Sequence, residues 1–149
     1  MVKPVSVPPG AAALYARVSS SGQKKDLEGQ IGRLVAFANA RGLAISRCVF
    51  EIGSGLNGRR PKLLKLLADP VAQTIVVEHR DRLMRLGSEY VEAALAAQGR
   101  RLVVADPNEV KDDLVQDMVE VLTWFCARLY GRRSARSRAQ RALAAVEAK

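Results

Sequence analysis

The sequence predicts an α/β fold: a mainly parallel sheet of four to five strands with helices on both faces, followed by a long C-terminal helix. Two observations predict it. Short apolar runs alternate with amphipathic helical patterns in the order β-α-β-α-β-α-β, which is typical of parallel strands joined by helical crossovers. From residue 112 onward the pattern is helical only. With 149 residues, the chain is long enough to bury a core of its own.

The first half of the chain predicts a leader (1–10), a strand (11–18), a loop (19–22), a helix (24–41) and a second strand (43–50). Three prolines mark the leader as flexible, and the apolar composition of the first strand predicts that it is buried. In the helix, Leu27, Ile31 and Leu34 lie on one face. Gly42 ends that helix.

The second half predicts a glycine-rich loop (53–60), a helix (63–67), a strand (73–78), a further helix (87–97) and a last strand (101–105). Pro61 suits the first turn of its helix, and Gly99 ends the later one. We therefore expect an α/β domain over residues 11–110. Residues 111–149 form the following helix, within the same structural unit.

Only Gly131 interrupts the helical pattern between Asp112 and about Val146. The apolar residues follow a near-heptad rhythm at positions 115, 118, 119, 122, 125, 126 and 129. The first half of this segment is acidic and the second half is basic. This pattern favours a helix that packs on a partner subunit and then reaches DNA. The alternative is that the apolar stripe covers the domain's own sheet.

Positive charge is concentrated near the C-terminus of a chain whose net charge is +9. From residue 128 onward there are seven cations and one anion. The arginines are Arg128, Arg132, Arg133, Arg136, Arg138 and Arg141. Such density predicts a nucleic-acid contact. A solvated tail is the alternative, and acidic lipid is a weaker one because no Trp or Phe lies among these arginines.

Several classes of protein are excluded. Cys48 and Cys126 lie far apart without a CxxC pair, and His79 is the only histidine, so we expect no metal site and reduced thiols in the cytoplasm. No apolar stretch is long enough to span a membrane, and no signal-peptide pattern is present. A membrane protein and a secreted disulfide scaffold are therefore excluded.

Arg17 and Ser19 lie two residues apart at the end of the first strand, so their side chains project to the same side. Ligand crevices of open parallel sheets lie at this carboxyl edge, where a serine and an arginine could bind or attack a phosphate. The alternative is that this serine-rich loop caps the next helix.

A second group of charged residues follows the third strand. Arg82 and Arg85 share one face of a helical turn with Asp81 adjacent, and the glycine-rich loop supplies Arg59 and Arg60. Several guanidiniums around one hydroxyl suit a phosphodiester that passes through a pentacovalent state. For Asp81 and Arg82, the alternative is a simple surface ion pair.

Four ordered motifs carry a resemblance to a known family. They are Tyr-Ala-Arg-Val-Ser-Ser-x-x-Gln (15–23), Ile-Gly-Ser-Gly-Leu-Asn (52–57), Glu-His-Arg-Asp-Arg-Leu-x-Arg (78–85) and Asp-Asp-Leu-Val-Gln-Asp-Met (112–118). From about Leu14 to Arg141 the chain resembles the catalytic domain of serine recombinases of the resolvase/invertase superfamily. It is most similar to those encoded by insertion sequences.

The resemblance implies that Ser19 is the nucleophile, which forms a 5′-phosphoserine link to DNA and leaves a free 3′ hydroxyl. The implied phosphate-binding arginines are Arg17, Arg82 and Arg85, with Arg60, rather than Arg59, as the loop arginine. Asp81 is implied to support the site, as are the polar side chains of Gln23 and Ser54. Neither ATP nor a metal is implied.

The resemblance also implies partners: double-stranded DNA of the nucleoid, and further copies of the chain that form a dimer and then a tetramer through the long helix. Insertion-sequence relatives carry a helix-turn-helix domain ahead of the catalytic domain, whereas only thirteen residues precede Leu14 here. We therefore expect a catalytic core without that domain.

Two other functions stay open from the residues. One is a non-catalytic remnant that oligomerises and binds DNA. The other is a binder or phosphatase for a phosphate ligand, against which the missing GxGxxG and P-loop sequences argue.

Overall fold

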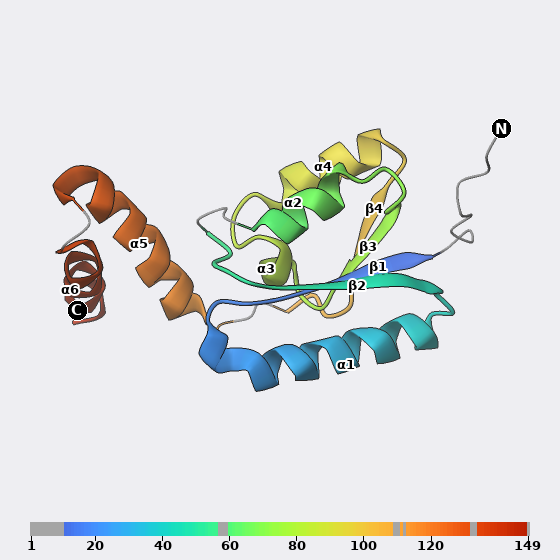
Figure 1. Cartoon of the computed structure of the whole chain (residues 1–149), viewed down its shortest axis with the longest axis horizontal. Coiled ribbons are helices and arrows are strands. Elements are labelled where there is room, and N and C mark those ends of the chain that lie inside the picture. Colours follow the sequence, from blue (N-terminus) through green and yellow to red (C-terminus); the bar gives the residue numbers. More distant parts are fainter. Residues whose placement is uncertain (1–10, 57–59, 109–110, 112, 132–133, 149) are drawn as a thin grey trace.

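The computed structural model describes residues 11–56, 60–108, 111, 113–131 and 134–148. Its centre is a parallel sheet of four strands in the order β2-β1-β3-β4 (Figure 1). The strands are β1 (Ala12–Val18), β2 (Ile45–Ile52), β3 (Thr74–Val77) and β4 (Arg101–Val104). The predicted fold class is therefore confirmed.

Helices cover both faces of this sheet (Figure 1). On one face lies α1 (Lys24–Ala40), and on the other lie α2 (Pro61–Ala68), α3 (Arg80–Leu83) and α4 (Ser88–Ala97). The short α3 and a 3-10 turn, η1 (Ser21–Gln23), were not predicted as separate elements. Both follow directly on strand ends, where the chain turns to enter the next element.

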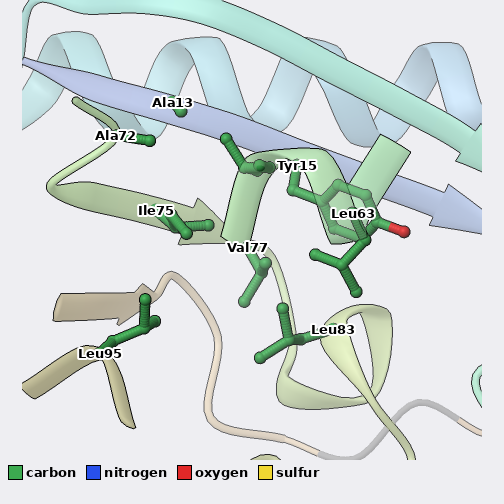
Figure 2. Packing of buried hydrophobic residues seen from close by; sticks show 9 residues of the cluster. Ala13, Tyr15, Leu63, Ala72, Ile75, Val77, Leu83 and Leu95 are labelled. Atoms are coloured by element: carbon green, nitrogen blue, oxygen red, sulfur yellow. The ribbon is translucent and has the colours of Figure 1, made fainter. Parts of the chain in front are cut away.

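The alternation of side chains along β1 divides the core into two halves. Its even-numbered residues pack under α1 in a cluster with Leu27, Leu34 and Ala38. Its odd-numbered residues, Ala13 and Tyr15, pack on the opposite side with the residues drawn in Figure 2. Arg17 is the next odd-numbered residue, so the end of β1 presents polar side chains on the α2 and α3 side.

The second strand begins and ends two residues later than the predicted range of 43–50. The cause is the end of α1. Gly42 has a φ of 67°, and Leu43 donates its backbone N–H to the Ala38 carbonyl at 2.9 Å. Leu43 is thus part of the helix cap, and the strand begins only when this turn is complete.

After β4 the chain forms α5 (Leu114–Tyr130) and α6 (Ala135–Glu147). The prediction that one helix continues to about Val146 is wrong, because Gly131 ends α5 with a φ of 86° that favours glycine. Figure 1 shows α5 extending away from the sheet, with α6 beside its far end. Ala135, Ala139 and Leu143, spaced by four, are the buried residues of α6.

The apolar stripe of α5 therefore does not serve to cover the domain's own sheet. Three residues of the stripe are exposed, Val115, Phe125 and Leu129, and so are the neighbouring Trp124 and Tyr130. Among the predicted regions, the leader 1–10 and residues Asn57, Arg59, Asp112, Arg132, Arg133 and Lys149 lie outside the described residues. Across the described ranges, no helix is both long and apolar enough to cross a lipid bilayer.

Glu51 connects the end of β2 to the start of α2. Its carboxylate accepts hydrogen bonds from the backbone N–H of Lys62 at 2.8 Å and of Leu63 at 3.1 Å, and from the Tyr15 hydroxyl at 2.9 Å. The Arg60 side chain makes no capping bond at this helix start. A strand residue thus supplies the cap that a helix N-terminus ordinarily takes from its own N-cap residue.

We expect Glu51→Ala to destabilise the fold by about 1–3 kcal/mol, because three donors, two of them buried, lose their acceptor. Urea denaturation at neutral pH measures the free energy of unfolding. Glu28→Ala on the exposed side of α1 is the control, with an expected effect within about 0.5 kcal/mol. Equal effects of the two variants would contradict the capping role.

Candidate active site

Arg17 lies on β1 beyond its last pair with β3, which joins Leu14 to Val76. At Arg17 the backbone of β1 therefore has no β3 partner, and the side chain of Gln30 from α1 takes that place. Its side chain accepts from the Arg17 N–H at 3.0 Å and donates to the Arg17 carbonyl at 3.1 Å. Gln30 is fully buried, so it fixes the backbone of Arg17. Sequence reasoning missed this residue, although a glutamine on the apolar face of α1 was a detectable signal.

The guanidinium of Arg17 is fully buried and donates to three backbone carbonyls. These belong to Gly53 at 3.0 Å, Asp81 at 2.5 Å and Arg82 at 3.0 Å. Its Nη1 also donates to Ser19 Oγ at 3.2 Å, as expected for side chains two apart on one strand. Burial lowers the pKa of Arg17, and the charge of Asp117 opposes that shift.

Ser19 is nearly buried, with 8% of its surface exposed. Its Oγ lies 2.8 Å from Asp113 Oδ2 and also contacts Asp117 Oδ1. Both aspartates lie at the start of α5, where Asp113 is the N-cap residue and Asp117 lies in the first turn. The spacing of four residues places them on one side of the helix. The sequence motif contained both, but we did not predict them as site residues.

Arg82 binds one of these two carboxylates and Arg85 binds both. Arg82 Nη1 donates to Asp113 Oδ2 at 3.0 Å, and Arg85 Nε donates to Asp117 Oδ2 at 2.6 Å. Arg85 Nη2 contacts Asp113 Oδ1, and its Nη1 donates to Asp81 Oδ2 at 3.3 Å. The structure thus gathers five predicted residues, Ser19, Arg17, Arg82, Arg85 and Asp81, around two that were not predicted.

Arg60 lies beside this group rather than within it. Its side chain is buried at 5% exposure and donates to the Leu83 carbonyl. Its Nη1 also lies 3.4 Å from the Arg82 carbonyl and 3.5 Å from the Tyr15 hydroxyl. Among the described residues, the Nε atoms of Arg60 and Arg82 are buried without a hydrogen-bond acceptor. Buried donors without an acceptor are uncommon in folded proteins, so these two atoms are an unsatisfied feature of the site.

The loop after β2 approaches the cluster closely at Gly55. Its N–H donates to Asp117 Oδ1 at 3.2 Å, and a Cβ built there would lie 2.7 Å from Arg17 Nη2 and 2.8 Å from Arg85 Cγ. Only glycine fits this position without moving an arginine. The neighbouring Ser54 is buried, and its Oγ accepts from the Leu56 N–H at 3.0 Å.

Gln23, predicted as a supporting residue, braces the loop rather than the arginines. Its Oε1 accepts from the Ser20 N–H at 3.0 Å and from the Ser20 hydroxyl at 3.1 Å. This arrangement forms a capping box for η1. Gln23 therefore fixes the segment that directly follows Ser19.

The predicted DNA-contact arginines that the structure describes are all exposed: Arg128, Arg136, Arg138 and Arg141. Arg128 lies over the Trp124 ring and Arg138 over the Tyr130 ring, at 4.7 Å and 4.3 Å from the ring centroids. Arg136 pairs with Glu120 at 3.1 Å. In the part of the chain that the structure describes, no group of His, Cys, Asp and Glu side chains could hold a metal ion.

Asp117 is fully buried yet ionised. Burial alone raises the pKa of its carboxyl, but the hydrogen bonds from Ser19 and Arg85 and the charge of Arg17 outweigh burial and lower the pKa below its ordinary value. The ionised form therefore stabilises the fold above the ordinary aspartate pKa of about 3.9, and this contribution is lost as the pH falls through the lower folded value.

We expect Asp117→Asn to destabilise the fold at pH 7, because Arg17 and Arg85 lose a buried partner. The difference from the parent chain should be constant near neutrality and shrink below about pH 4. Urea denaturation between pH 7 and pH 3 measures it, with Asp26→Asn on the exposed start of α1 as control. A difference that does not depend on pH would contradict an ionised Asp117.

Comparison with known proteins identifies the family to which the chain belongs. Residues 12–149 match the family model described as the resolvase N-terminal domain. The C-terminal catalytic domain of IS1535 TnpA, described as an IS607-like serine recombinase, is 60% identical with a TM-score of 0.81, over 93% of this chain and 99% of that one. A serine recombinase from Sulfolobus solfataricus is 35% identical with a TM-score of 0.72, over 89% and 94%.

Two curated relatives agree with this assignment. An uncharacterised protein of Mycobacterium tuberculosis is 51% identical over 92% of this chain and 46% of its own length. A putative resolvase of Acanthamoeba polyphaga mimivirus is 32% identical over 78% of this chain and 63% of its own. The chain thus spans about half the length of the mycobacterial relative. It belongs to the resolvase family, as the sequence motifs predicted, and has the catalytic-domain fold of serine recombinases.

Proposed function

We propose that this chain is the catalytic domain of a serine recombinase that breaks and rejoins DNA, with Ser19 as the nucleophile. One observation carries the proposal: a serine hydroxyl at the carboxyl edge of the sheet lies 3.2 Å from a nitrogen of the buried Arg17. The carboxylates that contact this hydroxyl are also bound by arginines, Asp113 by Arg82 and Arg85 and Asp117 by Arg85. Guanidiniums stay charged at all physiological pH values, so they suit a site for phosphodiester oxygens.

In this reaction Ser19 Oγ loses its proton and attacks the phosphorus of a DNA phosphodiester. The bond from phosphorus to the 3′ oxygen breaks, and that oxygen leaves as a hydroxyl after taking a proton. The 5′ phosphate stays bound to Ser19, so one phosphodiester replaces another and no ATP is consumed. Attack by a 3′ hydroxyl on the phosphoserine reverses the step and joins new partners. The arginines stabilise the charge of the pentacovalent state.

The C-terminal helices support the finer parts of the proposal. The exposed aromatic residues of α5 suit contact with a second copy of the chain, which we propose forms a dimer and then a tetramer. The exposed arginines of α5 and α6 suit double-stranded DNA of the nucleoid. We assign sequence recognition to a helix-turn-helix domain distinct from this catalytic domain. The alternative function, a non-catalytic DNA-binding remnant, predicts the same contacts without cleavage.

We expect the parent chain to form a covalent adduct with nicked duplex oligonucleotides at high concentration in the presence of a metal chelator. A denaturing gel should reveal a shifted band whose DNA is attached through its 5′ phosphate. Ser19→Ala should abolish the band, because it removes the attacking oxygen. Ser20→Ala, which changes the neighbouring hydroxyl, should retain it. A band that persists in Ser19→Ala would contradict this chemistry.

The oligomer is tested on the exposed face of α5. Phe125 is 52% exposed, so Phe125→Asp should leave the fold of the single chain unchanged. We expect it to raise the dissociation constant of the dimer by about tenfold or more, as for an aromatic anchor in a protein interface. Sedimentation equilibrium measures the constant. Val146→Asp, on the exposed side of α6, is the matched control, and an equal effect of both variants would place the interface elsewhere.

A further inference from the structure

We propose that Asp113 and Asp117 close the site at rest: their carboxylates occupy the arginine cluster in place of a DNA phosphate, so the start of α5 must move before Ser19 can react. This inference rests on the proposed function for the identity of the displaced ligand. It concerns the regulation of the site.

Three guanidinium donors that a phosphate would need are already used, whereas Arg82 Nε has no acceptor. Arg82 gives a hydrogen bond to Asp113 Oδ2, and Arg85 spans both aspartates through Nη2 and Nε. The two carboxylates at the start of α5 therefore present four oxygens to the arginine cluster. Planar guanidiniums bind carboxylate and phosphate oxygens with the same geometry, so the two ligands compete for one position.

The nucleophile is blocked in the same way. Both carboxylates contact Ser19 Oγ, and the residue is only 8% exposed. Attack requires the phosphorus to come within about 3–3.5 Å of Oγ, in line with the leaving oxygen. Bringing an anionic phosphodiester to that distance would place it against two buried carboxylates, which is strongly unfavourable. Phosphate and aspartates cannot share the site.

A general base is the other role that these contacts suggest. A base works best when its pKa lies near the working pH. Asp117 has the opposite property, because the hydrogen bonds from Ser19 and Arg85 and the charge of Arg17 outweigh its burial and keep its pKa below the ordinary value. A carboxylate held so firmly by arginines is a poor proton acceptor. It is a good substitute for another anion.

The placement of the two aspartates connects the site to the C-terminal helices. Both belong to the start of α5, which reaches into the domain and bonds Gly55 through Asp117 at 3.2 Å. The rest of α5 extends away from the sheet and lies beside α6 (Figure 1). A change in what packs against α5 therefore acts on the two carboxylates without any intermediate element.

Inorganic phosphate tests the closure without requiring cleavage. We expect Asp113→Asn/Asp117→Asn to bind phosphate at least about tenfold more tightly than the parent, because a site that is closed nine-tenths of the time weakens apparent affinity by that factor. Isothermal titration calorimetry at low ionic strength measures it. Glu92→Gln/Glu120→Gln removes the same charge from pairs outside the site, with Arg80 and Arg136. It should change the affinity by less than about threefold.

Equal affinities of the two double variants would overturn the closure. Circular dichroism establishes that each variant is folded, and the single variants Asp113→Asn and Asp117→Asn repeat the titration if the pair unfolds. Because asparagine keeps the size of aspartate, the shape of the site is retained.

The adduct assay gives an independent second result. The rate of adduct formation should rise about tenfold in Asp113→Asn/Asp117→Asn, since more of the chain is open, and should vanish when Ser19→Ala is added. A fall in rate would make the aspartates part of the cutting machinery and overturn the closure. If neither chain forms an adduct, the proposed function fails, while the phosphate titration still decides whether the aspartates close the site.

Discussion

The buried guanidinium of Arg17 is the constraint on which the rest of the structure depends. Moving a charged group from water into the protein interior is very unfavourable unless the group is paired and fully hydrogen-bonded. Here the bonds come from the carbonyls of Gly53, Asp81 and Arg82, which follow β2 and β3. Gly53 and the two α3 residues lie far apart in the sequence, yet both segments must reach one side chain on β1. The carboxyl edge of the sheet is therefore organised around one cation.

The bonds to that cation also hold Arg17 rigidly in place before any ligand arrives. Gln30 fixes the backbone of Arg17, and Gly55 allows the loop to approach its side chain. Arginines that are already oriented need no reorganisation when negative charge develops, which is the property that makes electrostatic stabilisation of a transition state effective. The same rigidity demands a counter-ion at rest, because several guanidiniums close together repel one another. The aspartates of α5 meet that demand.

Local periodicity was sufficient to predict the part of this arrangement that lies within one element. Arg17 and Ser19 share a side because strands repeat every two residues, and the order of strands and helices followed from alternating apolar patterns. Ligands from a distant element were not predictable in that way. Asp117 lies 98 residues from Ser19, and no local sequence pattern indicates that these two side chains are in contact.

Two other differences have distinct physical causes. Gln30 was not predicted because the buried face of α1 was inferred from its apolar residues only. A buried glutamine that bonds a strand backbone interrupts that apolar pattern. The single C-terminal helix was wrong because Gly131 can either continue a helix or end it. Here Gly131 has a positive φ, so α5 ends and α6 lies beside it.

Charge at the site also indicates how cleavage could be restricted to an assembled complex. Two carboxylates carry more negative charge than the single phosphodiester that would replace them, so the arginine cluster by itself favours the closed state. The free energy that opens the site must then come from contacts elsewhere on the chain. The exposed aromatic face of α5 and the exposed arginines of α6 are the surfaces that can supply it, through a second subunit and through DNA. Because α5 carries both the aspartates and that face, the proposed closure implies that an isolated chain that meets DNA by chance stays closed, and that a partner that moves α5 would permit cutting.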